Sequence, residues 1–236
     1  MTPSTPADTH EFARSLRPQD FGRTRPTSIA DPIVEPAWPG LRVIAAVGGG
    51  RGSIWVDGEP LDDHPELAAA LEQNTAHIAP GGAIFEAYVT KQIASEGVGI
   101  RTWVNEYPTM AGQVSRMFIG GRRNRIQEFE ERREAEVAAM ELGEEEAVNL
   151  VVVDLLWLDG QSLFDVPLLE RRRVLDSIVA PSTLIRPGPY VRHPIGSWVG
   201  SWRAQGFRGM TFKAANSRYR PGETADDWTL SDLPRR

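Results

Sequence analysis

The sequence predicts a domain of the mixed α+β class. From Ile33 onward, short apolar runs alternate with turns that contain Gly and Pro, a pattern typical of strands. Helical segments follow these strands without the regular strand–helix–strand alternation of a parallel sheet. The length of 236 residues and a hydrophobic content of 41% are sufficient for one large buried core or two small ones.

Residues 1–30 differ in composition from the rest of the chain. They are rich in Pro, Thr, Ser and Asp and show little apolar periodicity, which is typical of flexible segments. We therefore expect a flexible leader over 1–30, with a short helical turn around Glu11 to Leu16. The folded domain is expected over 31–236.

The first part of the folded domain carries clear strand and helix signals. Apolar runs at 41–47 and 53–56 predict two strands, and the glycine-rich stretch 48–52 between them predicts a hairpin turn. This stretch lacks the Gly-Lys-Ser/Thr ending of a phosphate-binding loop. A short helix is expected over 65–73, where Ala and Leu residues share one face, and a further strand over 83–90.

The second part begins with the strongest helix signal in the chain. Residues 122–142 are dense in Glu and Arg at i,i+4 spacing, with Ile126, Phe129, Val137 and Met140 on the apolar side. A charge run of this kind predicts a solvated helix face and does not by itself indicate nucleic-acid binding. The remaining expected elements are a strand around 151, a helix over 168–179, a helix bearing Trp198 and Trp202, and a strand over 210–213.

Composition excludes several classes of protein and site. The chain has no cysteine, so it has no disulfide, thiolate metal site or thiol nucleophile. It has no long apolar run and no secretory signal, so we expect no membrane segment and a cytoplasmic location. Its four histidines lack metal-ligand spacing. The net charge of −6 argues against a uniformly basic DNA-binding surface but leaves room for a local basic groove.

Several segments together carry a resemblance to one family. The most informative runs from Val152 to Gly160 and on to Arg172, and it reads as a buried strand, an acidic turn and an Arg-rich helix start. Three further segments match in the expected order along the chain, 35–42 before it and 208–213 and 217–228 after it. Together these segments resemble the adenylation (nucleotidyltransferase) domain of ATP-dependent DNA ligases. The resemblance covers residues 33 to 230 or so.

The resemblance implies an antiparallel-sheet nucleotidyltransferase fold, similar to ATP-grasp, and no C-terminal OB domain in this chain. It implies ATP and Mg²⁺ as cofactors of an intact member, although the residues themselves require neither. It also implies a nucleotide, DNA or a DNA-repair protein as partner, and no membrane. The candidate nucleotide-binding residues are Glu35, Arg42, Glu86, Val153 and Lys213.

The same comparison shows where the chain departs from the family pattern. The nucleophilic lysine of the Glu-Pro-Lys-aromatic-Asp-Gly motif corresponds to Ala37, and its aspartate corresponds to Pro39. The acid of the Glu-Gly-x-x-x-Lys motif corresponds to Arg208. The adenine-packing aromatic corresponds to Val153, and two late lysines correspond to Leu230 and Asp232. Because self-adenylylation needs an amine nucleophile, the sequence predicts a catalytically inactive member with no catalytic residue and no metal site.

Alternatives remain open at this point. The chain has only two lysines, Lys91 and Lys213, so an active nucleotidyltransferase with altered chemistry would have to use Lys213 together with Arg42. A sensor that binds ATP without turnover would rest on the same pair. A third interpretation is that Glu35, Arg42 and Lys213 pair with one another as a remnant. The metal-organising glutamate of the family aligns with Tyr88 or, in a shifted register, with Glu86.

Overall fold

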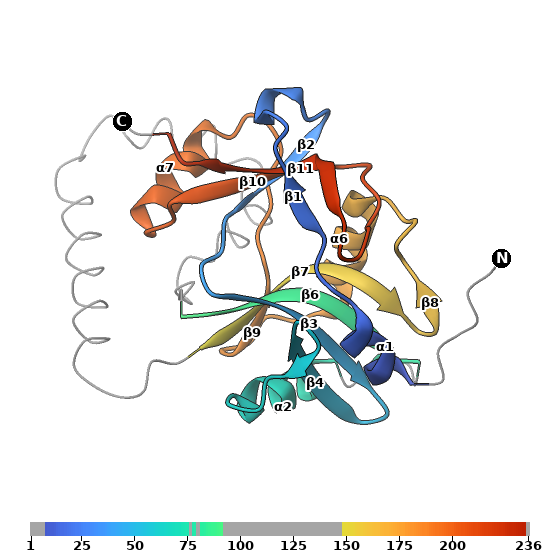
Figure 1. Cartoon of the computed structure of the whole chain (residues 1–236). Coiled ribbons are helices and arrows are strands. Elements are labelled where there is room, and N and C mark those ends of the chain that lie inside the picture. The colour runs from blue at the N-terminus through green and yellow to red at the C-terminus, as the bar shows by residue number, and fades with distance from the viewer. Residues whose placement is uncertain (1–7, 76, 79–80, 92–147, 235–236) are drawn as a thin grey trace, which may run out of the picture. The chain divides into compact units, whose positions relative to one another are not determined.

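The computed structural model describes residues 8–75, 77–78, 81–91 and 148–234. The chain divides into two compact units, residues 1–92 with 148–236 and residues 93–147. All the elements described below belong to the first unit (Figure 1). The helix predicted over 122–142 lies outside the described residues.

The larger sheet has the strand order β5-β4-β3-β6-β7-β8, with β9 paired to β7. The central strands are antiparallel to one another, whereas β9 runs parallel to β7. Nine of the ten residues of β7 are buried, as expected for its almost continuous apolar run. The bounds are β3 Leu41–Gly48, β4 Arg51–Val56, β5 Glu59–Pro60, β6 Ala83–Thr90, β7 Asn149–Leu158, β8 Gln161–Ser162 and β9 Ile185–Pro187.

The smaller sheet has the order β1-β11-β10-β2. Its strands are antiparallel except β1, which lies parallel to β11. A short 3-10 helix, η1 (Pro26–Ser28), separates β1 from β2. The bounds are β1 Asp20–Gly22, β2 Pro32–Pro36, β10 Gly209–Ala214 and β11 Thr224–Asp232.

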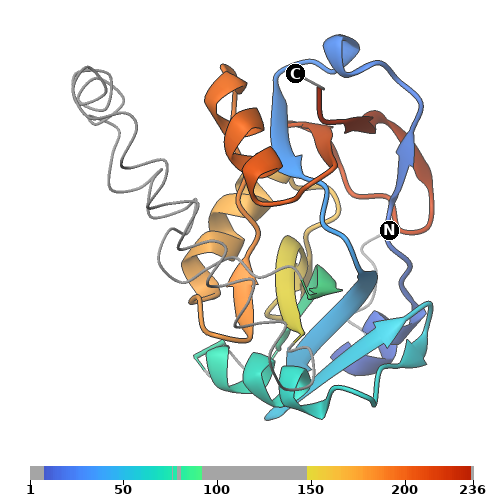
Figure 2. The same ribbon diagram turned by 90° about the vertical axis from the view of Figure 1, so that its left-hand side faces the viewer.

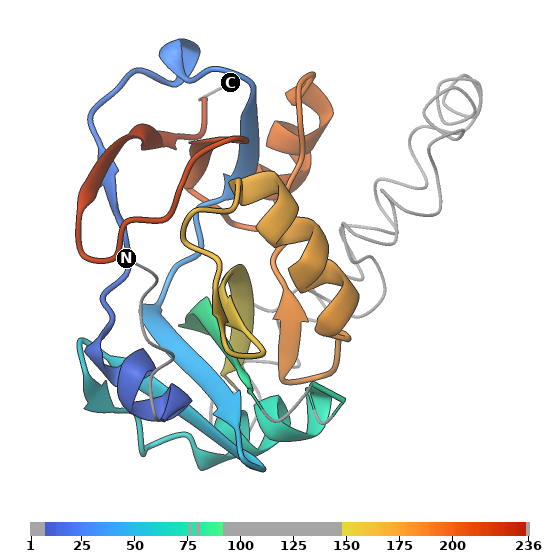
Figure 3. The ribbon, with the colours of Figure 1, turned by 90° about the vertical axis from the view of Figure 1, so that its right-hand side faces the viewer.

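The helices cover both faces of the larger sheet. Helix α2 (Pro65–Asn74) lies against β4, and helix α6 (Leu168–Ile178) lies along β7 (Figures 2 and 3). Leu67 and Leu71 of α2 and Leu175 of α6 pack with alternate residues of β3 into one core. Helix α1 (Thr9–Ser15) contributes to a second core with the intervening residues of β3. The period-two alternation of β3 therefore fills both cores. Helix α7 (Gly196–Ala204) carries the buried Trp202.

Residues 8–30, which the sequence predicted to belong to a flexible leader with a short helical turn around Glu11 to Leu16, contain a helix, a strand and a 3-10 helix. Helix α1 begins after Asp8, whose carboxylate accepts a hydrogen bond from the backbone N–H of His10, and it buries Ala13 completely. Strand β1 extends the smaller sheet beside β11. The apolar residues of this segment are too widely spaced to show a periodic pattern, so only their tertiary partners reveal its structure.

The other predicted elements within the described residues are confirmed to within a few residues at their ends. The glycine-rich stretch is a hairpin turn between β3 and β4, with positive φ at Gly49 and Gly50. No helix among the described residues is long and apolar enough to cross a membrane.

The close contact between Gly52 and α2 provides a test of this packing. A Cβ atom added at Gly52 would lie 2.1 Å from the backbone oxygen of Ala68, so Gly52→Ala must displace α2. We expect a loss of about 1–3 kcal/mol in the free energy of unfolding, measured by urea denaturation. Gly200→Ala is the matched control. It meets no atom within 4 Å and lies within α7, so it should raise stability slightly. Equal effects of the two substitutions would contradict the packing described for α2.

Candidate functional site

The position that corresponds to the ligase nucleophile lies at the end of β2. Glu35 and Pro36 pair with Thr211 and Met210 of β10, and the N–H of Ala37 continues this ladder by donating to the oxygen of Gly209 over 2.9 Å. The backbone that would present a nucleophile is therefore held in place by two strands. The side chain at this position is a methyl group.

The surroundings of Ala37 are apolar. A Cβ added at Gly209 would lie 3.3 Å from the Cβ of Ala37 and 3.8 Å from Cδ1 of Leu230. Leu230 is 56% exposed, and Asp232 pairs with Gly209 across the sheet. Within the described residues there is no group of three His, Asp or Glu side chains that could hold a metal ion.

Lys213 and Glu35 form a buried ion pair. The Nζ of Lys213 lies 2.7 Å from Oε2 of Glu35, and the two side chains are 1% and 3% exposed. The ammonium also lies 4.4 Å from the ring centroid of Trp228. Lys213 pairs with Ile33 in the register of the sheet. It lies four residues along β10 from Gly209, the residue beside Ala37, which corresponds to roughly 13 Å along the strand. Lys213 is thus paired as a cation away from the nucleophile position.

Arg42 and Glu86 form a second buried pair. Nε and Nη2 of Arg42 donate to Oε1 of Glu86 over 2.9 and 2.7 Å, and the hydroxyl of Tyr219 donates to Oε2 over 2.6 Å. Burial alone would lower the pKa of Arg42, but Glu86 together with Tyr88 and Tyr219 outweighs burial and raises that pKa. Burial and the nearby carboxylate both raise the pKa of Tyr219. Glu86 and Tyr88 lie two residues apart on one face of β6, and Glu86 is the acid that binds Arg42.

Two arginines at the start of α6 complete this region, and the sequence analysis did not assign them to the site. Arg171 binds Asp154 through two hydrogen bonds of 2.9 and 2.7 Å, with both side chains fully buried. Arg172 donates to the backbone oxygens of Val153 and Gly188, and its Nη1 lies 3.5 Å from Oε1 of Glu35. The signal available in the sequence was the Arg-rich helix start that follows the signature strand.

Five side chains therefore form what we call the charge cluster: Glu35, Arg42, Glu86, Arg172 and Lys213. The ring of Phe21, from the segment expected to be flexible, lies 5.0 Å from the guanidinium carbon of Arg42 and 5.9 Å from Nζ of Lys213. The structure thus brings four of the five predicted site residues into two ion pairs, each with its cation near this ring. The fifth, Val153, is 1% exposed and packs toward Gly188.

Three buried polar atoms in this region have no hydrogen-bond partner. They are Oε1 of Glu35, Nε of Arg172 and Nε1 of Trp38. Trp38 and Val153 both lie within 3.5 Å of a Cβ added at Gly188, and Arg172 donates to the oxygen of that glycine. Two donors, on Trp38 and Arg172, therefore lack a hydrogen-bond partner in the region of Gly188, and Oε1 of Glu35 has only the 3.5 Å ion pair with Arg172. Such atoms are rare in native proteins and indicate a polar ligand or water.

Comparison with known proteins finds similarity to DNA ligases. Residues 117–229 match the family model described as ATP dependent DNA ligase domain. A DNA ligase of Methanothrix thermoacetophila is 33% identical over 82 residues, which are 34% of this chain and 15% of that protein. The multifunctional non-homologous end joining protein LigD of Mycolicibacterium smegmatis is 30% identical over 87 residues, 34% of this chain and 10% of that protein.

Solved structures support the same fold. The ligase domain of LigD from M. tuberculosis superposes with a TM-score of 0.62 at 18% identity, covering 93% of this chain and 60% of that chain. A mycobacterial DNA ligase D complexed with ATP and MES gives a TM-score of 0.61 with the same identity and coverage. The chain therefore spans only part of each of these relatives. Residues 117–229 thus match the ATP dependent DNA ligase domain, and the chain shares the mixed α+β fold with antiparallel sheets of the LigD ligase domain.

Proposed function

We propose that this chain is a catalytically silent adenylation domain, a ligase-type scaffold that has kept its fold and lost its reaction. The observation that carries the proposal is Ala37. Its backbone is in the β2–β10 ladder, but its side chain offers no amine to attack the α-phosphate of ATP.

The two lysines of the chain do not favour a substitute nucleophile. Lys213 is held 2.7 Å from Glu35 and over the ring of Trp228, so its amine is engaged away from the position of Ala37. Lys91 is an exposed residue that follows β6. The alternative of an active nucleotidyltransferase that uses Lys213 and Arg42 is therefore not favoured, because both cations are already paired with buried carboxylates.

A second candidate function is a nucleotide sensor that binds ATP without turnover. The unpartnered atoms of Glu35, Trp38 and Arg172 support it, because together they offer one acceptor and two donors to a planar polar group. Mg²⁺ does not fit this region. Arg208 occupies the position of the family's acid, and the described residues contain no cluster of carboxylates for a divalent ion. Nucleotide binding at this site would thus be independent of metal.

For the silent domain itself we propose a partner-binding role in DNA repair. The support is the name of one relative, a non-homologous end joining protein, together with the family match. The net charge of −6 favours a protein partner over direct DNA binding, since DNA-binding surfaces carry a basic excess.

Restoring the lost residues tests the main proposal. The native chain, incubated with radiolabelled ATP and Mg²⁺, should form no covalent adenylate, and Ala37→Lys alone should form none because the surrounding charges are still wrong. A variant that combines Ala37→Lys, Pro39→Asp, Arg208→Glu, Leu230→Lys and Asp232→Lys should become labelled. Labelling of the native chain, or sealing of nicked DNA by it, would overturn the proposal.

A thermal-shift titration with ATP tests the sensor. Binding that is exclusive to the folded state stabilises it by about 2.7 kcal/mol at one hundred times the dissociation constant, so the melting temperature should rise to saturation, equally with Mg²⁺ and with EDTA. Trp38→Phe removes one donor and keeps a ring, so it should weaken the response. Trp198→Phe on α7 is the control. The absence of any shift at millimolar ATP would reject the sensor and leave the silent domain standing.

The scaffold role of the Arg42–Glu86 pair can be tested separately. Glu86→Leu leaves a buried guanidinium and a buried hydroxyl without their acceptor, and we expect a loss of about 3–5 kcal/mol in the free energy of unfolding. Glu170→Ala, which removes an exposed partner of Arg173, should cost under about 1 kcal/mol. Urea denaturation measures both. A small effect of Glu86→Leu would show that this pair is dispensable for the fold.

A further inference from the structure

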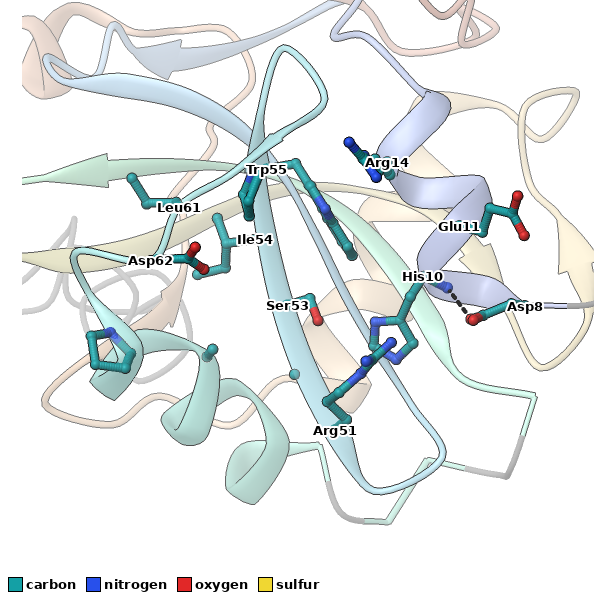
Figure 4. Close-up of a pocket in the computed structure, with 14 residues that line it drawn as sticks. Asp8, His10, Glu11, Arg14, Arg51, Ser53, Ile54, Trp55, Leu61 and Asp62 are labelled. Carbon is teal, nitrogen blue, oxygen red and sulfur yellow. Dashed lines mark hydrogen bonds between the residues drawn. The ribbon is translucent and has the colours of Figure 1, made fainter.

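A groove apart from the charge cluster lies between α1 and α2, with strand β4 between them (Figure 4). The cavity has a volume of about 540 Å³, within the range of about 300–1,000 Å³ that is usual for ligand sites. His10 comes from α1, Arg51 and Ser53 from β4, and Ala68 from α2. None of the charge-cluster residues lines this groove.

The outer edge of β4 is only partly paired. Strand β5 pairs with β4 at Trp55 and Val56, and the oxygen of Ile54 accepts from the N–H of Leu61 over 2.9 Å on the same side. Alternate residues of an antiparallel strand direct their backbone groups to the same side, so those of Gly52 also point outward. Within the described residues no group on that side bonds to Gly52. The groove therefore contains an open strand edge.

His10 places a buried acceptor at the wall of this groove. Its side chain is 7% exposed, and its Nε2 lies 3.0 Å from the oxygen of Gly48. A carbonyl oxygen only accepts, so Nε2 carries a proton, and in the neutral ring Nδ1 then presents a lone pair. This Nδ1 is buried and has no partner. Asp8 caps the helix at His10, and the hydroxyl of Thr9 donates to the oxygen of Gly81 over 3.2 Å, so the ring is held in place.

Carboxylates outnumber guanidinium groups by three to two along the groove. The carboxylates are Asp8, Glu11 and Asp62, and the cations are Arg14 and Arg51. Arg14 already donates to the oxygen of Gly58 over 3.0 Å. The rim thus offers more negative than positive charge, which favours a cationic group and disfavours a phosphate or an acidic peptide.

We propose that the groove binds an extended segment of a partner protein that carries a lysine side chain. The main chain of the segment pairs with Gly52 as an added strand, and its ammonium donates to Nδ1 of His10 beside the acidic rim. The unpaired edge gives affinity through backbone hydrogen bonds, and the buried acceptor selects the side chain. This inference concerns a site apart from Ala37 and is independent of whether the domain is catalytically silent.

The test uses the full chain and a short strand-forming peptide, acetyl-Val-Thr-X-Thr-Val-amide, with X as lysine, glutamate or leucine. Backbone amide shifts are followed by NMR during titration. The lysine peptide should shift the amides of Arg51, Gly52 and Ser53 and bind at least tenfold more tightly than the glutamate peptide. A lysine peptide with N-methylated central amides should not bind, because it cannot extend the sheet. Three outcomes would each overturn the proposal. They are shifts without selectivity for lysine, no shift at Gly52 with any peptide at millimolar concentration, and stronger binding by ATP.

Two variants locate the selectivity. Asp62→Lys reverses a rim charge on an exposed side chain, so it should weaken binding of the lysine peptide and strengthen that of the glutamate peptide. Asp226→Lys makes the same change on an exposed residue of β11 outside the groove and should alter neither. His10→Leu removes the acceptor and should abolish the preference for lysine over leucine. If Asp62→Lys has no more effect than Asp226→Lys, the acidic rim does not determine the preference for the lysine peptide.

Discussion

The hydrogen-bonded group of Arg42, Glu86 and Tyr219 joins the two sheets of this domain. Glu86 lies in the larger sheet, whereas Tyr219 lies between β10 and β11 of the smaller one. Arg42 also donates to the backbone oxygen of Gln19, just before β1. A carboxylate with no exposure to water must be satisfied entirely by protein donors. The position of the smaller sheet against β3 and β6 therefore depends on this one acid.

The same requirement shows how the buried charges of this domain can be stable without a bound ligand. Here Lys213 pairs with Glu35, and Arg172 binds two backbone oxygens. Internal partners satisfy most of the charges, so they stabilise the core without a ligand. Only a few polar atoms around Gly188 remain without a partner.

Most elements of the fold could be predicted from local pattern. The alternation in β3, the buried run of β7 and the leucines of α2 each identify an element from residues that are neighbours in sequence. The segment before Ile33 could be assigned only in part, through the helical turn expected around Glu11 to Leu16, where α1 lies. Its residues Ala13 and Phe21 have no periodic neighbours, and their burial depends on strands that come later in the chain.

The sequence by itself determined the family resemblance, the class of the fold and the absence of a lysine at Ala37, because each of these is a property of residue type and order. Tertiary structure alone decided that Glu35 pairs with Lys213, that Arg172 joins them, and that the open edge at Gly52 lies between α1 and α2. The physical reason is that side-chain partners are chosen by distance in space. Tyr219 and Glu86 are 133 residues apart in the chain yet 2.6 Å apart in the fold.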